Sequence, residues 1–180
     1  MIIYTISYKD ISDATKNLRD ISYEHWLRYE LFTFDWWFLL ALSIIPWIIW
    51  WKALDKNRKN EIIMFGLLVG LMSVIIEYIG EYIALWWGYK IKLFPGGVTH
   101  FFPFDLTVLP VTYMLVYQYF PKWRSFLIGM LILSFGAAFV FEPLLYWMDI
   151  YVLLTWKYVY SFPIYFVMGL FFKWLVKKIK

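Results

Sequence analysis

The sequence contains no cysteine among its 180 residues. Disulfide bonds, iron–sulfur clusters, thiolate zinc sites and cysteine nucleophiles are therefore excluded. Glycine and proline are scarce, at 9 and 7 residues, and follow no repeat, which excludes a collagen-like or low-complexity chain. Charged residues make up only 17% of the chain, too few for an intrinsically disordered protein.

Apolar and aromatic residues dominate instead, at 63% hydrophobic and 24% aromatic. A soluble domain is about half apolar and about a quarter charged. Five apolar runs are long enough to cross a hydrocarbon core of about 30 Å as helices rising about 1.5 Å per residue. They are Asp35–Trp51, Ile62–Trp87, Phe101–Phe120, Ser125–Met148 and Tyr158–Val176. We therefore expect an all-α integral membrane bundle of about five transmembrane helices over residues 35–180.

Residues 1–34 form a more polar segment, which we expect to be a separate unit. Its start lacks the charged and apolar regions of a signal peptide, so we expect it to remain in the mature protein. Asp10 or Ser12 is a suitable helix N-cap. Apolar residues then recur at steps of three or four, as on one helix face: Ile11, Ala14, Leu18 and Ile21. This pattern predicts an N-terminal amphipathic interfacial helix on the lipid bilayer, with docking to a protein partner as the alternative.

The basic residues predict an orientation. One group lies in the first connector, the third connector and the C-terminal segment: Lys52, Lys56, Arg58, Lys59, Lys122, Arg124, Lys173, Lys177, Lys178 and Lys180. The other, smaller group consists of Lys9, Lys16, Arg19, Arg28, Lys90, Lys92 and Lys157. Because cytoplasmic loops carry the excess of Lys and Arg, we expect the N-terminus outside and the C-terminus in the cytoplasm. Basic residues placed between apolar runs do not form a soluble basic face, so nucleic acid is not an expected partner.

The run Ile62–Trp87 carries small residues on one helix face. At steps of three or four, with Glu77 among them, these are Gly66, Gly70, Ser73, Gly80 and Ala84. Gly66 and Gly70 form a pair spaced to let a neighbouring helix backbone approach closely. We expect this helix to pack at the centre of the bundle. A homo-oligomer interface is the alternative.

Four acidic residues lie within the apolar runs, where a charged side chain costs a few kcal/mol or more. They are Glu77, Glu81, Asp105 and Glu142, and the expected topology places all four in the outer half of the bilayer. His100 lies at the same interface and would admit a transition metal. We predict a buried polar or ion site from these five residues, and the metal and any cofactor stay open. Hydroxyls at comparable depth come from Tyr78, Tyr82, Tyr146, Tyr158, Tyr160 and Tyr165.

Such a group of carboxylates has several uses. They can form a structural hydrogen-bond network, share protons or hold a cation, orient a lipophilic or cationic ligand among aromatic rings, or act as an acid/base pair. No nucleophile frame or phosphate-binding loop accompanies them, so we expect a protein that is not an enzyme. We predict that it binds an ion, a lipophilic ligand or a membrane protein partner through this acidic and aromatic pocket. Proton- or cation-coupled transport, or a channel component, is the alternative.

Several sequence blocks carry a family resemblance. The blocks are Trp26–Phe38, Ile45–Lys52, Phe102–Pro110, Tyr117–Trp123, Glu142–Leu144 and Trp156–Pro163. Together they resemble an uncharacterised family of small multi-pass membrane proteins of endospore-forming Firmicutes. The resemblance implies a bacterial plasma membrane location and supplies no catalytic residues.

Overall fold

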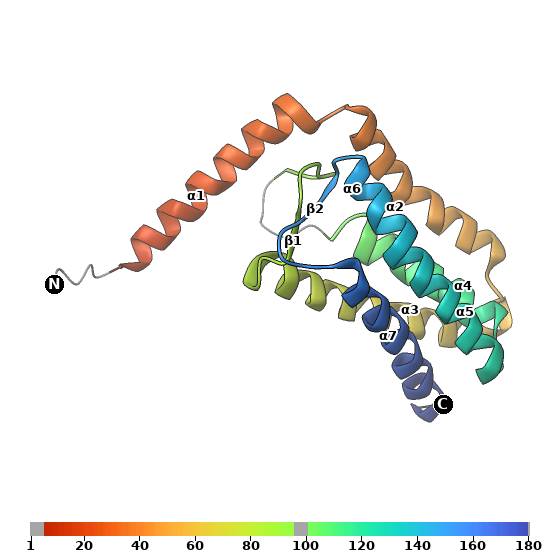
Figure 1. Ribbon diagram of the computed structural model, residues 1–180. Coiled ribbons are helices and arrows are strands. Elements are labelled where there is room, and N and C mark those ends of the chain that lie inside the picture. Colours follow the sequence, from red (N-terminus) through yellow and green to blue (C-terminus); the bar gives the residue numbers. More distant parts are fainter. Residues whose placement is uncertain (1–5, 96–100, 180) are drawn as a thin grey trace.

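The computed structural model describes residues 6–95 and 101–179, and it confirms an all-α membrane bundle (Figure 1). The α-helices are α1 (Tyr8–His25), α2 (Phe34–Ala53), α3 (Lys59–Glu77), α4 (Leu109–Tyr119), α5 (Trp123–Gly136), α6 (Glu142–Trp147) and α7 (Tyr158–Ile179). A 3-10 turn covers Lys56–Arg58, and π-helical segments cover Trp26–Glu30, Tyr78–Ile83, Phe104–Val108 and Ala137–Phe141. Two short strands, β1 (Trp87–Tyr89) and β2 (Tyr151–Leu153), pair antiparallel with Gly88 opposite Val152.

Four helical stretches of the described chain are long and apolar enough to cross a membrane: Phe34–Ala53, Lys56–Ile83, Trp123–Trp147 and Tyr158–Ile179. The remaining expected run, Phe101–Phe120, is shorter as a helix. It forms a π-helical segment of 5 residues and then 11 residues of α4, together about 24 Å at about 1.5 Å per residue. The second run also ends early, because Leu85 adopts a left-handed φ of 50° and Trp87 already belongs to β1. A left-handed residue terminates a right-handed helix.

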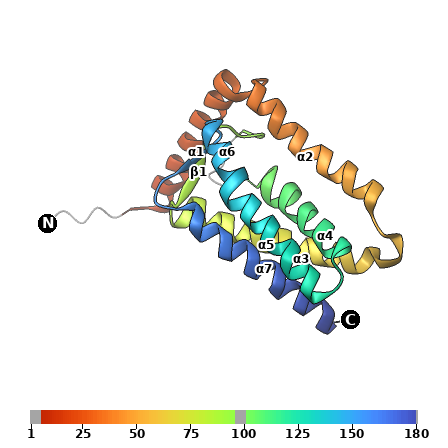
Figure 2. The same ribbon diagram turned by 45° about the vertical axis from the view of Figure 1, so that its right-hand side comes forward.

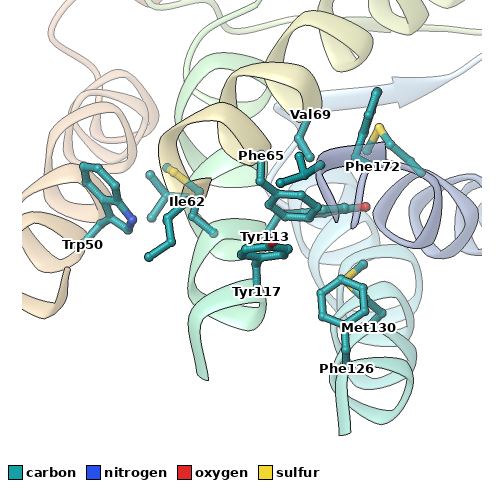
Figure 3. Close-up of a cluster of buried hydrophobic side chains, with 13 residues drawn as sticks. Trp50, Ile62, Phe65, Val69, Tyr113, Tyr117, Phe126, Met130 and Phe172 are labelled. Atoms are coloured by element: carbon teal, nitrogen blue, oxygen red, sulfur yellow. The ribbon is translucent and has the colours of Figure 1, made fainter. Parts of the chain in front are cut away.

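The main apolar cluster fills the space between α3, α4, α5 and α7 (Figure 3). Phe65 of α3 stacks on Tyr117 of α4 with ring centroids 4.4 Å apart, and Phe126 of α5 meets both rings edge-on. A β-carbon at Gly66 would lie 2.4 Å from the Met114 sulfur, so only glycine permits this approach of α3 to α4. The helix α3 therefore packs at the centre of the bundle.

The small-residue face expected on α3 stops short of its predicted length. Gly70 lies against the segment that precedes α4, and Ser73 is buried. Gly80, however, faces the Trp87 ring of its own returning chain, and Ala84 is the C-cap of the π-helical segment. Helix-to-helix packing by this face therefore ends near Ser73.

The helix α1 extends from the bundle as an arm and buries none of its residues (Figure 1). Ser7 caps it in a reciprocal arrangement, in which the Asp10 amide donates to the Ser7 hydroxyl and the Ser7 amide donates to the Asp10 carboxylate. The expected cap at Asp10 or Ser12 is wrong, because Asp10 occupies the third helical position of this capping box. The arm ends at Trp26–Glu30, and α2 begins at Phe34 with Thr33 as its cap.

The connectors gather at two ends of the bundle (Figure 2). At one end, which we call the strand-pair end, β1 pairs with β2, and Trp26 Nε1 donates to the Lys92 carbonyl at 3.0 Å. At the opposite end, the Gln118 side chain accepts from the Asp55 amide and donates to the Ala53 carbonyl. The two groups of basic residues therefore lie at different ends, as far as their members fall within residues 6–95 and 101–179. Which end faces the cytoplasm stays a prediction.

Candidate functional site: a carboxylate-lined cavity at the strand-pair end

A cavity of about 370 Å³ lies between the β1–β2 strand pair and the ends of α3, α4, α5, α6 and α7. Most of its lining is apolar or aromatic, including Phe104, Phe141 and Leu145. Glu77 and Glu142 contribute carboxylates, and Tyr89, Tyr151 and Tyr165 contribute phenol rings. Among the described lining residues there is no Lys, Arg or His. The cavity thus combines a mostly apolar wall with two carboxyl groups.

The four acidic residues lie in or beside π-helical segments. Glu77 is the last residue of α3 before Tyr78–Ile83, which contains Glu81. Asp105 lies inside Phe104–Val108, and Glu142 follows Ala137–Phe141. A π turn inserts an extra residue into a helix and so changes the direction of the side chains that follow; such turns are frequent at functional sites. The local backbone is therefore irregular at every one of these acids.

Glu142 is held by hydroxyl groups of α7. Ser161 Oγ donates to one carboxylate oxygen at 3.0 Å, and the Tyr165 hydroxyl donates to the other at 2.7 Å. Trp156 Nε1 donates in turn to Ser161 Oγ at 2.9 Å. Glu142 is 7% exposed, so this network fixes its orientation in an environment with little water.

Glu77 is held by Trp87 of strand β1. Trp87 Nε1 donates to Glu77 Oε1 at 2.7 Å, and the Trp87 ring meets the Trp156 ring edge-on at 5.1 Å. The Trp86 carbonyl accepts from the amides of residues 154, 155 and 156, which ties the two loops together. The β1–β2 strand pair thus forms the end wall of the cavity, and its Trp87 donates to Glu77.

Glu81 and Asp105 are buried beside the cavity but do not line it. Glu77 interacts electrostatically with both of them and with Glu142, so all four acids lie in one region. One Asp105 oxygen has no hydrogen-bond partner among the described residues. His100 lies outside the described residues. Within residues 6–95 and 101–179, no three His, Asp or Glu side chains are placed to hold a metal ion.

Several lining residues are not among those predicted from the sequence. Of the six tyrosines expected near the acids, Tyr165 binds Glu142, while Tyr78, Tyr82, Tyr146 and Tyr160 are exposed. Tyr89 and Tyr151 line the cavity instead, and burial raises the pKa of both hydroxyls, so they remain protonated. They face each other across the strand pair, a contact between residues distant in sequence.

A second polar group lies at the opposite end. Lys173 is 1% exposed; its ammonium donates to the Phe120 carbonyl at 2.9 Å and lies 3.8 Å from the Phe126 ring centroid. Nearby, Glu61 accepts from the Tyr117 hydroxyl. Lys173 and Ser161 are twelve residues apart on α7, about 18 Å along its axis. This buried cation therefore does not neutralise Glu142.

Comparisons with models of known families, with curated proteins and with solved structures find no match for this chain. The family resemblance of the sequence blocks stays a prediction.

Proposed function

We propose that the protein is a non-enzymatic integral membrane protein that binds an amphipathic organic cation in the cavity. The observation that carries the proposal is the pairing of two buried carboxylates, Glu77 and Glu142, with an aromatic wall that includes no basic residue among its described members. Sites for small molecules have about 300–1,000 Å³ and are mostly apolar with a few placed polar groups. The cavity fits that description.

Electrostatics supports a cation as the occupant. An ionised carboxylate in an apolar bundle is costly unless a charge of opposite sign accompanies it, and without such a charge the group tends to take up a proton. Lys173 is at the wrong end of α7 to serve Glu142. A ligand ammonium would supply the missing charge, and the rings of Trp87, Trp156 and Tyr151 would add cation–π attraction. Binding the cation would thus offset the cost of burying the acids.

The packing favours binding over transport. Between the cavity and the opposite end, Phe65, Tyr117, Phe126 and Met130 form a closely packed apolar core. A transported ion would have to cross this core. A ligand that enters and leaves at the strand-pair end requires no such path.

The location we propose is the bacterial plasma membrane, with the strand-pair end outside and the C-terminus in the cytoplasm. The larger group of basic residues supports this orientation, because its described members lie at the end opposite the β1–β2 strand pair and cytoplasmic loops carry the excess of Lys and Arg. The ligand would then enter from outside or from the outer leaflet.

Ethidium, a planar aromatic cation with environment-sensitive fluorescence, is a suitable probe for the full chain in lipid nanodiscs. We expect saturable binding that weakens at least tenfold, about 1.4 kcal/mol, in Glu142→Gln. The matched control is Asp149→Asn, an exposed acid at the same end that pairs with Lys90 and does not line the cavity, and we expect its affinity to stay within twofold.

A second variant tests the cavity without removing a charge. Gly136 lines it, and a β-carbon there would meet nothing within 4 Å, so Gly136→Leu fills open space. We expect this variant to fold normally and to weaken ethidium binding. The proposal would be overturned if ethidium does not bind the unmodified protein. It would also be overturned if ethidium binds Glu142→Gln and Gly136→Leu as tightly as it binds the unmodified protein.

A further inference from the structure

An apolar groove adjoins the cavity on the outside of the bundle. It lies between α3 and α7 and has a volume of about 440 Å³. Every residue that lines it is apolar, among them Met72 of α3 and Val167 and Phe171 of α7. Ile76 and Ile164 line both the cavity and the groove, so the two hollows share a wall. The site as a whole is therefore polar at one end and apolar along the other.

The groove lies on a surface that faces lipid. Val167 is 58% exposed and Phe171 is 47% exposed, although both are large apolar side chains in a candidate membrane span. Ser161 next to Glu142 and Phe171 at the far part of the groove are ten residues apart on α7, about 15 Å along the axis. That distance is comparable to an extended dodecyl chain.

We propose that the ligand is a single-chain amphiphile, with a cationic head in the cavity near Glu142 and an alkyl tail in the groove between α3 and α7. This inference rests on the proposed function and names its ligand class. A compact aromatic cation would use the cavity alone. A groove that begins at the same two isoleucines and carries no polar lining residue suits the tail of a molecule whose head is already held.

The tail gains little hydrophobic free energy on leaving the bilayer, because lipid tails are as apolar as the groove. Its selectivity comes from close packing against Met72, Val167 and Phe171. The test must therefore separate contact with the groove from simple partition into lipid. Comparing variants in the same nanodiscs with the same probe cancels the partition.

Butyltrimethylammonium and dodecyltrimethylammonium have the same head and different tails, and each can be titrated against bound ethidium. Val167→Trp fills the groove, and we expect it to weaken displacement by the dodecyl probe at least fivefold while the butyl probe stays within twofold. Val140→Trp is the matched control, since Val140 is 60% exposed and lines neither hollow. We expect it to change neither probe.

The possible outcomes separate the two proposals. If both probes displace ethidium and Val167→Trp weakens them equally, or weakens neither, the tail does not occupy the groove, and cation binding in the cavity still stands. If ethidium binds without regard to Glu142, or neither probe displaces it, the proposed function itself fails. Selective loss of the dodecyl probe in Val167→Trp alone supports the amphiphile.

Discussion

Gly80 holds open the space that the Trp87 ring occupies. A β-carbon at Gly80 would lie 2.1 Å from Trp87 Cζ2 and 2.2 Å from Cη2, far inside van der Waals contact. The ring cannot turn away freely, because its nitrogen donates to Glu77 and it packs against Trp86 and Trp156. The substitution Gly80→Ala must therefore displace the indole or shift the π-helical segment. Either change disturbs the site without removing any of its polar groups.

The expected loss of stability follows from three effects. Overpacking costs about 1–3 kcal/mol, and leaving a buried Glu77 oxygen without its donor costs about 1–3 kcal/mol. The better helix propensity of alanine returns about 1 kcal/mol. We expect Gly80→Ala to lower the free energy of unfolding by about 1–5 kcal/mol, the balance of these three effects. Unfolding in mixed dodecyl maltoside and SDS micelles, followed by circular dichroism, measures this quantity.

Gly136→Ala is the matched control. Gly136 also lines the cavity, has a helical φ of −61° and has no atom within 4 Å of its β-carbon position. We expect its stability to be unchanged or to rise by up to about 1 kcal/mol, from helix propensity.

A double-mutant cycle locates the clash. Phenylalanine lacks the outer indole ring that a Gly80 β-carbon would meet, so Gly80→Ala should cost at least about 1 kcal/mol less in a Trp87→Phe background. Equal costs in both backgrounds, or equal costs for the two glycines, would refute the reasoning.

Three further predictions concern the rest of the molecule. Lys173→Ala should lower the free energy of unfolding by about 2–4 kcal/mol in the same micelles, because it leaves a cavity and an unpaired carbonyl, and Lys173→Met should lose less than half of that; equal losses would mean that packing plays no part. Glu30→Ala removes the acceptor that lies 2.5 Å from the Lys92 amide, so hydrogen exchange at that amide should accelerate about tenfold, for a loss of about 1–3 kcal/mol; unchanged exchange would show that the arm is held otherwise. Because the chain has no cysteine, Asn57→Cys and Thr155→Cys provide unique labelling sites. An impermeant maleimide should label Thr155→Cys in intact cells and Asn57→Cys only after permeabilisation, and the reverse would invert the proposed orientation.

Helices occur at all five runs predicted from the sequence, and four of them are long and apolar enough to cross a membrane. Their composition forces every backbone group to be satisfied within the segment, and a helix does this. The third run is helical from Phe104 to Tyr119, close to its predicted bounds, but this helix is too short to be among the four candidate spans. The small-residue face was extended through Gly80 and Ala84 at a period of 3.6, but the π-helical segment after Glu77 breaks that period.

The region of the acids could be predicted because successive spans alternate in direction. Counting residues from one end of each run therefore gives the depth of each acid. Which acids face the cavity could not be predicted. Glu77 and Glu142 line it, whereas Glu81 and Asp105 lie beside it, because the extra residue at a π turn changes which side chains face inward.

The sequence by itself determined the solvent of this protein. A chain with so many apolar and so few charged residues buries its surface in lipid, and its few acids must gather where other polar groups are. The tertiary structure alone decided what those acids meet. Trp87 reaches Glu77 through pairing with a strand more than sixty residues away, and Ser161 reaches Glu142 through the packing of α7. Contacts between distant segments depend on how whole helices pack against one another, and no local pattern of residues encodes that packing.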